Sequence, residues 1–193
     1  ENNNEKFVKQ IKQNLINKNY CLIFYFDKSR DIKTFKIFLN LSKKYNNLHV
    51  VYNPKIKNLA DAYYNAYLYA SKIKSKWVIS MNAGFRHQPS DLKYFIKKLN
   101  HNVSCIWGYR SLVAKNYSIK RRVISKLGNF LSIKFLGISI KDPTSGFYAI
   151  RSNLLKDTLI KIKSFKSKYH FFDTELKFYL KNKKYLSQKI KYK

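Results

Sequence analysis

Acidic residues are scarce in this chain, and their scarcity sets its electrostatics. Of 193 residues only 10 are Asp or Glu, against 40 Lys or Arg, so the formal net charge is +30 at pH 7. Such a field attracts polyanions, including nucleic acids, anionic membranes and phosphate-bearing substrates. The abundance of Lys, Asn, Ile, Tyr and Phe also fits an A/T-rich coding sequence, which would leave many lysines as solvated surface charge. Both interpretations of the charge stay open.

Several features that mark particular chemistries are also missing. The only cysteines, Cys21 and Cys105, are far apart and form no Cys-x-x-Cys pair, which favours buried thiols in a reducing compartment over a zinc site. No apolar run approaches the roughly 18 residues that span a bilayer, and no secretory signal is visible. Hydrolase and P-loop chemistry gain no support, because neither a Ser-His-Asp nor a Cys-His arrangement nor a glycine-rich phosphate loop occurs.

What is present predicts one folded domain of the α/β class. A hydrophobic fraction of 45% argues against disorder, and no linker interrupts the chain. Apolar runs predict strands at 20–26, 48–52, 77–81, 103–107 and 147–150, with an extended stretch at 184–192. Helical periodicity predicts helices at 5–17, 32–45, from about 58, 91–99, 117–136, 152–162 and 171–181. The alternation predicts βαβ units and a mostly parallel sheet with helices on both faces.

The stretch from Trp77 to Ser90 organises the rest of the chain. A short apolar strand stops at Asn82, a polar loop follows, and a helix opens near Pro89. In open α/β sheets, ligands bind at the carboxyl ends of strands, so we expect the binding site here.

Helix 117–136 is amphipathic and basic, with five Lys or Arg and no acidic residue between positions 119 and 136. Basic amphipathic helices often lie on anionic membrane surfaces. A domain helix with a lysine-rich outer face is the alternative interpretation.

Three motifs occur in order along the second half. Residues 121–125 read Arg-Arg-Val-Ile-Ser, residues 142–147 read Asp-Pro-Thr-Ser-Gly-Phe, and residues 172–175 read Phe-Asp-Thr-Glu. Together they resemble the Arg-Arg-x-x-Ser, Asp-x-Thr-x-Gly-Phe and Phe-Asp-x-Glu motifs of family-2 glycosyltransferases, and within these the dolichyl- or polyprenyl-phosphate sugar synthases. The resemblance implies a GT-A type, Rossmann-like sheet. We expect the first strand of that sheet to be missing from the N-terminus of this chain. Residues 1–193 would then form a single domain, with a nucleotide-binding half (1–110) and an acceptor or membrane-side half (111–193).

The resemblance also implies nucleotide-sugar-binding residues in the first half. The family's Asp-Asp-x-Ser-x-Asp strand end becomes Phe-Asp-Lys-Ser-Arg-Asp at 26–31, and its Asn-x-Gly helix start lacks the glycine after position 58. The implied residues are Asp27, Ser29, Asp31, Asn58, Asn82 and Gly84. Asp27 would contact the base or ribose, or alternatively cap the following helix.

The organising stretch departs from the family pattern. Asn82 and Gly84 occupy the two positions of the family's metal-binding Asp-x-Asp, so the Mg²⁺ or Mn²⁺ that the resemblance implies lacks its ligands, and we expect no metal site. In one interpretation Arg86 and nearby lysines replace the metal as a fixed cation on the diphosphate. In the other the site has decayed, and the protein is a pseudo-enzyme with a binding or scaffolding role.

The remaining candidates follow from the same resemblance. Arg110, Arg122 and Asp142 join Arg86, the possible substitute for the metal, in the candidate catalytic set, in which Arg110 and Arg122 would hold a lipid phosphate and Asp142 would orient an arginine or the acceptor. Arg121, Arg122 and Ser125 form the implied membrane-side set. Solvated surface charge is the alternative for the arginines, and a turn role for Asp142. His87 is expected to be structural, and Glu175 to pair with an arginine.

These observations favour a protein related to enzymes that transfer a sugar from a nucleotide-sugar to a polyprenyl phosphate, acting cytoplasmically at the periphery of a membrane. Its expected partners are a nucleotide-sugar, a polyprenyl-phosphate lipid, an anionic membrane surface and a membrane-anchoring subunit. An inactive membrane-associated scaffold is the competing hypothesis. Nucleic-acid binding is disfavoured, since the lysines are dispersed and no recognition motif is present.

Overall fold

The protein is described here by a computed structural model of residues 3–27, 32–83, 85–110 and 119–192. At positions 119–122, 125 and 129 only the backbone is described. Ser29, Asp31 and Gly84, three of the expected nucleotide-sugar residues, lie outside the described residues.

Helices and strands alternate as the sequence predicts. The strands are β1 (Leu22–Phe26), β2 (Leu48–Tyr52), β3 (Trp77–Ser80), β4 (Cys105–Arg110), β5 (Tyr148–Arg151) and β6 (Tyr185–Ile190). The helices are α1 (Asn3–Asn14), α2 (Ile32–Lys44), α3 (Leu59–Lys72), α4 (Leu92–Lys98), α5 (Ile119–Leu136), α6 (Ser152–Ile162) and α7 (Phe172–Tyr179), with a 3₁₀ turn at Pro89–Asp91. Every predicted element is therefore found, with boundaries shifted by at most three residues.

The strands form two sheets rather than one. β1 and β2 pair in parallel, and a second sheet has the order β3-β5-β4-β6. β4 and β6 are parallel, whereas β5 runs antiparallel to both of its neighbours. Most strands thus share one direction, as expected, and β5 is the exception, because the chain enters it from the turn at 142–146.

β1 and β3 are not hydrogen-bonded to each other in the described part of the chain. Helix α3 packs against both strands, and apolar side chains of both strands join one cluster on the opposite face. The division of the sheet therefore falls between β1 and β3. The expected first strand is not among the described residues, and its absence from the protein stays a prediction.

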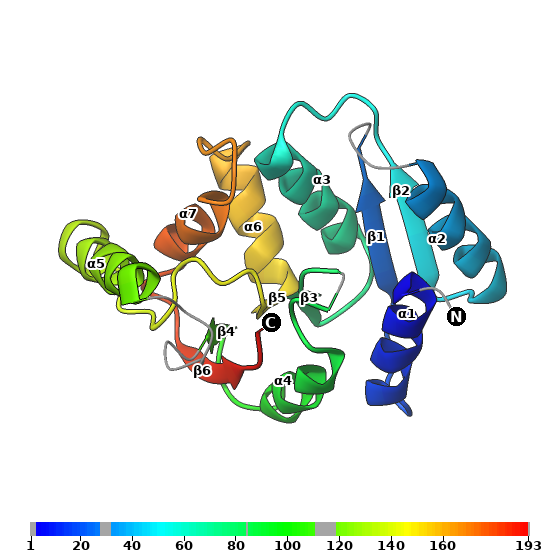
Figure 1. The fold of residues 1–193 in the computed structure, drawn as a ribbon, viewed down its shortest axis with the longest axis horizontal. Helices are drawn as coiled ribbons and strands as arrows, with labels where there is room; N and C mark the ends of the chain where they lie inside the picture. The colour runs from blue at the N-terminus through cyan, green and yellow to red at the C-terminus, as the bar shows by residue number, and fades with distance from the viewer. Residues whose placement is uncertain (1–2, 28–31, 84, 111–118, 193) are drawn as a thin grey trace.

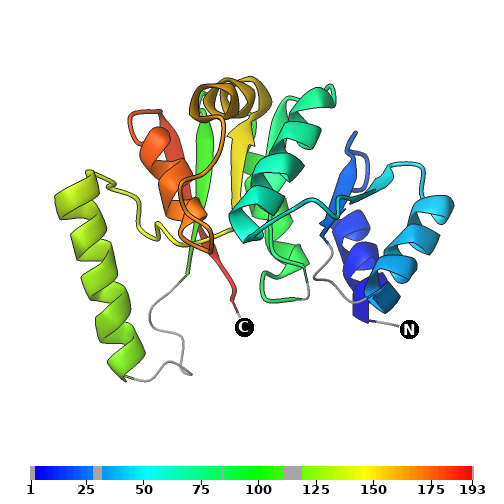
Figure 2. The same cartoon turned by 90° about the horizontal axis from the view of Figure 1, so that it is seen from above.

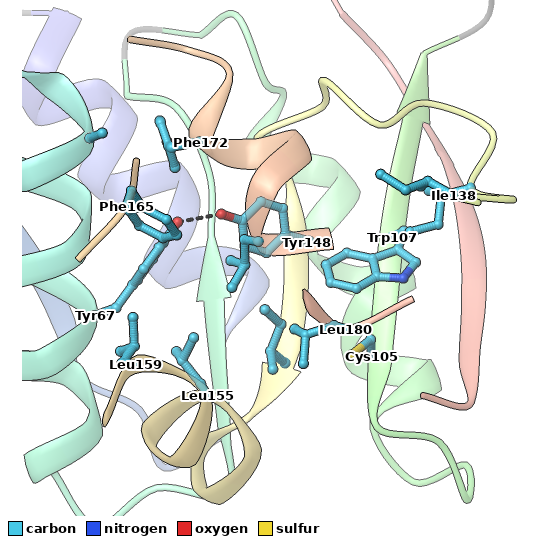
Figure 3. Packing of buried hydrophobic residues seen from close by; sticks show 14 residues of the cluster. Tyr67, Cys105, Trp107, Ile138, Tyr148, Leu155, Leu159, Phe165, Phe172 and Leu180 are labelled. Atoms are coloured by element: carbon cyan, nitrogen blue, oxygen red, sulfur yellow. Dashed lines mark hydrogen bonds between the residues drawn. The ribbon is translucent and has the colours of Figure 1, made fainter. Parts of the chain in front are cut away.

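Alternating side chains of β4 and β5 supply the two faces of the four-stranded sheet. Trp107 and Tyr148 point into a cluster with α3, α6 and α7, whereas Ile106 and Ala149 pack with α1 and α4 on the other side. Figure 3 shows the first cluster, with Tyr67 of α3 facing Tyr148. Helices cover both faces, which accounts for the continuous apolar runs in the strands.

Helix α5 stands apart from the rest of the domain in both views, at the end opposite β1 and β2 (Figures 1 and 2). Many of its large apolar side chains are exposed to solvent, among them Val123, Ile124, Leu127, Phe130, Leu131, Ile133 and Phe135. Its sequence includes five basic residues and no acid. Among the described helices none is long and apolar enough to cross a membrane.

Candidate functional site

Three segments converge at the carboxyl end of β3: the Asn82 loop, the turn at 142–146 and the first turn of α7. Gly146 lies at their centre. A Cβ atom added to Gly146 would stand 3.3 Å from Asp173 Oδ2 and 3.4 Å from Asn82 Oδ1. The missing side chain therefore leaves a small space bounded by one carboxylate and one carboxamide oxygen, at the strand end where the sequence predicts the site.

Asn82 is held in place from two sides. Its backbone N–H donates to Nδ1 of His87 over 2.9 Å, and its side-chain oxygen accepts from the Tyr63 hydroxyl over 3.3 Å. Because Nδ1 accepts, His87 is the neutral tautomer with its proton on Nε2. Burial, with the Arg110 charge second, lowers the pKa of His87 to about 4. The buried ring stacks on Phe147, so the expected structural role of His87 fits its surroundings.

Arg86 is exposed on the same loop, and no hydrogen bond or ion pair joins it to another described residue. It is thus placed where it could meet a ligand from solvent. Whether it reaches a diphosphate stays a prediction.

Arg110 and Asp142 form a bidentate ion pair. Nε of Arg110 donates to Oδ2 over 2.7 Å and Nη2 to Oδ1 over 2.9 Å, while the Arg110 backbone N–H also donates to Oδ2. Nη2 further donates to the hydroxyl of Thr144. Burial raises the pKa of Asp142, but the hydrogen bonds and charge of Arg110 outweigh it, and the net shift is downward. Asp142 therefore orients an arginine, as one interpretation of the motif expected.

Lys177 of α7 is fully buried beneath the turn. Its Nζ donates to the carbonyl oxygens of Pro143 over 2.8 Å and Ser145 over 2.6 Å, so it clamps the turn onto the helix. Burial lowers the pKa of Lys177 to about 8, against the opposing effect of Asp173 and Asp142. The ammonium also lies over the rings of Trp107 and Tyr148, which favours its charged form.

A chain of buried hydroxyls connects Asp173 to the core. The Tyr148 hydroxyl donates to Asp173 Oδ1 over 3.1 Å and is hydrogen-bonded to the Tyr67 hydroxyl (Figure 3). The Tyr67 hydroxyl in turn donates to Ser80. Burial raises the pKa of Asp173 to about 6, although Lys177 and Tyr148 act in the opposite direction. The carboxyl group thus titrates near neutrality at the edge of the Gly146 space.

Tyr192, just beyond β6, closes one side of the site. It forms a β-bridge with His87, and its ring lies 5.5 Å from the His87 ring and 5.1 Å from the Arg110 guanidinium carbon. The preceding residue, Lys191, donates its backbone N–H to the carboxylate of Asp91. The last strand therefore helps to fix the loop that follows β3.

The remaining predicted residues lie at the start of α3, after β1 and on α5. Asn58 is the N-cap of α3, where its side chain accepts from the Asp61 backbone N–H and donates to the Asp61 carboxylate. Asp27 directly follows β1. The backbones of Arg121, Arg122 and Ser125 belong to α5, but their side chains lie outside the description.

Sequence reasoning missed Lys177 and misjudged Glu175. Glu175 accepts from the backbone N–H groups of Lys166 and Ser167, and no described arginine pairs with it. The expected arginine partner is wrong because the loop before α7 folds back onto the carboxylate. Asp173, four residues before Lys177, is the acid of the Phe-Asp-x-Glu motif that reaches the site. That helical spacing is the one signal in the sequence that could have paired the two.

Residues 2–159 match the family described as Glycosyl transferase family 2. The chain belongs to this family. Similar solved structures include glucosyl-3-phosphoglycerate synthase from Mycobacterium tuberculosis in complex with phosphoglyceric acid, at 12% identity and a TM-score of 0.56, covering 99% of this chain and 69% of that one. A complex of the same enzyme with Mn²⁺, uridine diphosphate and phosphoglyceric acid has 13% identity and a TM-score of 0.57, over 98% and 67%.

At these identities the structural likeness establishes the shared GT-A fold and no more. The family match agrees with the resemblance of the sequence motifs to family-2 glycosyltransferases. A lipid-phosphate acceptor and a soluble one are both compatible with it, and the similar enzyme is a glucosyl-3-phosphoglycerate synthase.

The residues at the strand end do not fit a divalent cation. Mn²⁺ and Mg²⁺ prefer about six oxygen ligands with carboxylates among them. In the two positions of the family's Asp-x-Asp, Asn82 offers a carboxamide oxygen and Gly84 has no side chain to offer. Among the described residues no group of three His, Cys, Asp or Glu side chains gathers to hold a metal. The two acids nearby are committed elsewhere, Asp142 to Arg110 and one oxygen of Asp173 to Tyr148.

Proposed function

We propose that this protein binds a nucleotide-sugar at the convergence of Asn82, Gly146 and Asp173, and acts on a polyprenyl-phosphate lipid at a cytoplasmic membrane surface. Family membership supports the nucleotide-sugar. The site has a carboxylate, a carboxamide and the exposed cation Arg86 at the end of β3, which suits a sugar and a diphosphate. The observation that carries the membrane-bound acceptor is the exposed apolar side of α5.

Helix α5 has the composition of an interfacial helix. Leu127 and Phe130 are 54% and 56% exposed, and Phe135 is 72% exposed. Exposing so much apolar surface on one helix costs roughly 25 cal/mol per Å², a cost that a lipid surface would remove. The basic residues of the same helix would attract anionic headgroups, and its lack of acids avoids repulsion. A phosphate-bearing lipid would reach the site from the surface on which this helix lies.

A second candidate is an inactive family member that serves as a membrane-associated subunit. The observation that favours it is that Asn82 and Gly84 stand in the two positions of the family's metal-binding Asp-x-Asp, where neither can ligate a metal as a carboxylate does. This candidate keeps the membrane surface and gives up the transfer reaction.

Isothermal titration with nucleotide-sugars, with and without Mn²⁺, tests the nucleotide site. The proposed enzyme binds at least one of them, and Arg86→Gln weakens binding about tenfold through loss of the phosphate contact. A wild-type chain that binds none under either condition would exclude transfer and leave the subunit role.

Vesicle flotation tests the membrane role. The protein is expected to float with vesicles containing anionic lipid, less so as salt rises. Paired Leu127→Ser and Phe130→Ser substitutions remove flotation, whereas Ile32→Ser, an equally exposed apolar position on α2, leaves it unchanged. Neutralising Arg121 and Arg122 weakens it. Unchanged flotation in the paired variant would show that α5 is not the anchor.

A further inference from the structure

Four charged side chains are arranged around the turn at 142–146, and their charges cancel. Asp142 and Asp173 contribute two negative charges, and Arg110 and Lys177 two positive ones. Each acid experiences the charges of both bases. Lys177 and both acids are nearly or fully buried, and Arg110 is half-buried. Because water screens buried charges poorly, this balance governs which further ion can enter.

The position of Lys177 is fixed by its own contacts. Two of its three N–H donors are occupied by Pro143 and Ser145 carbonyls, and its stem follows α7 one turn after Asp173. Its ammonium is therefore held against the Ser145 carbonyl, one residue before Gly146, and its charge acts on the Asp173 carboxylate that borders the Gly146 space. Arg110 is likewise fixed by its fork on Asp142.

We propose that Lys177, together with Arg110, takes the place of a divalent cation in this protein, so that the site excludes Mn²⁺ and Mg²⁺. A metal at the Gly146 space would meet one carboxamide oxygen and one carboxylate whose charge Lys177 already balances. It would also be repelled by two fixed cations, since the charges of Lys177 and Arg110 both act on the Asp173 carboxylate. The lysine thus performs two roles that a metal often fills, since it neutralises the acids and holds the loop that carries Gly146.

The inference rests on the proposed nucleotide-sugar site, but its test needs no nucleotide. The probe is Mn²⁺ alone, followed by electron paramagnetic resonance, in which the signal of the free aqua ion falls as the ion binds. Wild-type protein is expected to leave the free-ion signal unchanged up to about millimolar Mn²⁺, the weak end of protein sites for hard cations. Nucleotide-sugar binding, measured separately, then succeeds or fails independently.

Two double variants of equal net charge test the role of Lys177. Asn82→Asp with Lys177→Gln restores an acid and removes the resident cation. Asn82→Asp with Lys181→Gln makes the same change in charge, but Lys181 donates to Leu136 and lies outside the four-charge group. The first variant is expected to bind one Mn²⁺ at least tenfold more tightly than the second. Lys177→Met replaces Lys177→Gln if thermal melting shows that the glutamine variant is unfolded.

Two results would overturn the proposal. In one, wild-type protein binds stoichiometric Mn²⁺, and Asn82→Ala or Asp173→Asn abolishes that binding. The metal would then occupy this site despite Lys177. The other is equal Mn²⁺ affinity of the two folded double variants, since the lysine would then not be what excludes the ion.

Discussion

The carboxamide oxygen of Asn82 and the carboxylate of Asp173 face the same small space, 3.4 Å and 3.3 Å from where a Cβ on residue 146 would stand. One comes from the end of β3 and the other from the first turn of α7. Gly146, in the turn before β5, is what lets them approach. The space between these two oxygens defines the site, and it is about the size of a methyl group.

Gly146→Ala is expected to weaken nucleotide-sugar binding by at least about tenfold, because the methyl group fills the space between the two oxygens. The contacts at 3.3 and 3.4 Å are tight but can relax slightly, so the free energy of unfolding should fall by only about 1 kcal/mol. Titration calorimetry and thermal melting measure the two effects. Gly128→Ala is the control, since its Cβ meets nothing within 4 Å on α5, and it should raise stability slightly.

Gly108→Ala is expected to disrupt the fold rather than the site. Its Cβ would stand 2.3 Å from the carbonyl oxygen of Phe147, a backbone atom of the segment entering β5 that cannot yield without breaking the β4–β5 pairing. The loss in the free energy of unfolding should be about 3 kcal/mol or more. Urea denaturation followed by circular dichroism measures it. A loss below about 1 kcal/mol would mean that the two strands separate more easily than their geometry indicates.

His87 should make the protein sensitive to acid. Its pKa is about 4 in the folded state against about 6.5 when unfolded, so the unfolded chain binds the extra proton between these values. The stabilisation is fully present above pH 6.5 and is lost as pH falls toward 4, about 3 kcal/mol in all. The difference in stability between wild type and His87→Gln should therefore shrink from pH 7 to pH 4. His101→Gln, which changes an exposed histidine, is the control and should alter the free energy of unfolding at pH 7 by less than about 0.5 kcal/mol.

Asp142→Asn should cost about 2 kcal/mol of stability, because it leaves the half-buried Arg110 fork without its charged partner. The pKa of Asp142 is lowered in the folded state, so wild type loses this contribution as pH falls through that pKa. The variant should lack that part of the acid transition. Denaturation at several pH values measures both. Asp157→Asn, an exposed acid on α6, should change stability by less than about 0.5 kcal/mol.

Much of the fold could be predicted from the sequence because its local signals agree. Continuous apolar runs marked strands covered on both faces, and Asn58 marked the start of α3, where the structure shows its cap. The direction of β5 could not be predicted in this way. A strand's direction depends on where the preceding turn delivers the chain, and the turn at 142–146 is held by α7, which comes later in the sequence.

The site was predicted in part. The stretch 77–90 was expected to hold the site, which stays a prediction, and the structure pairs Asp142 with Arg110, one of the alternatives that the motif left open. Lys177 was not foreseen, because lysines are seldom fully buried and this chain has many that are exposed. The exposure of α5 was also undecided, since one amphipathic pattern serves a packed helix and a helix on a lipid surface alike.

The sequence by itself determined the order of helices and strands, the family and the absence of carboxylates at the end of β3. These follow from local periodicity and from residue identities, which need no tertiary contacts. Only the tertiary structure decided that Asp173 and Asn82 share the space at Gly146 and that Lys177 is buried beneath them. The physical reason is that charges distant along the chain can balance only after packing removes the water between them.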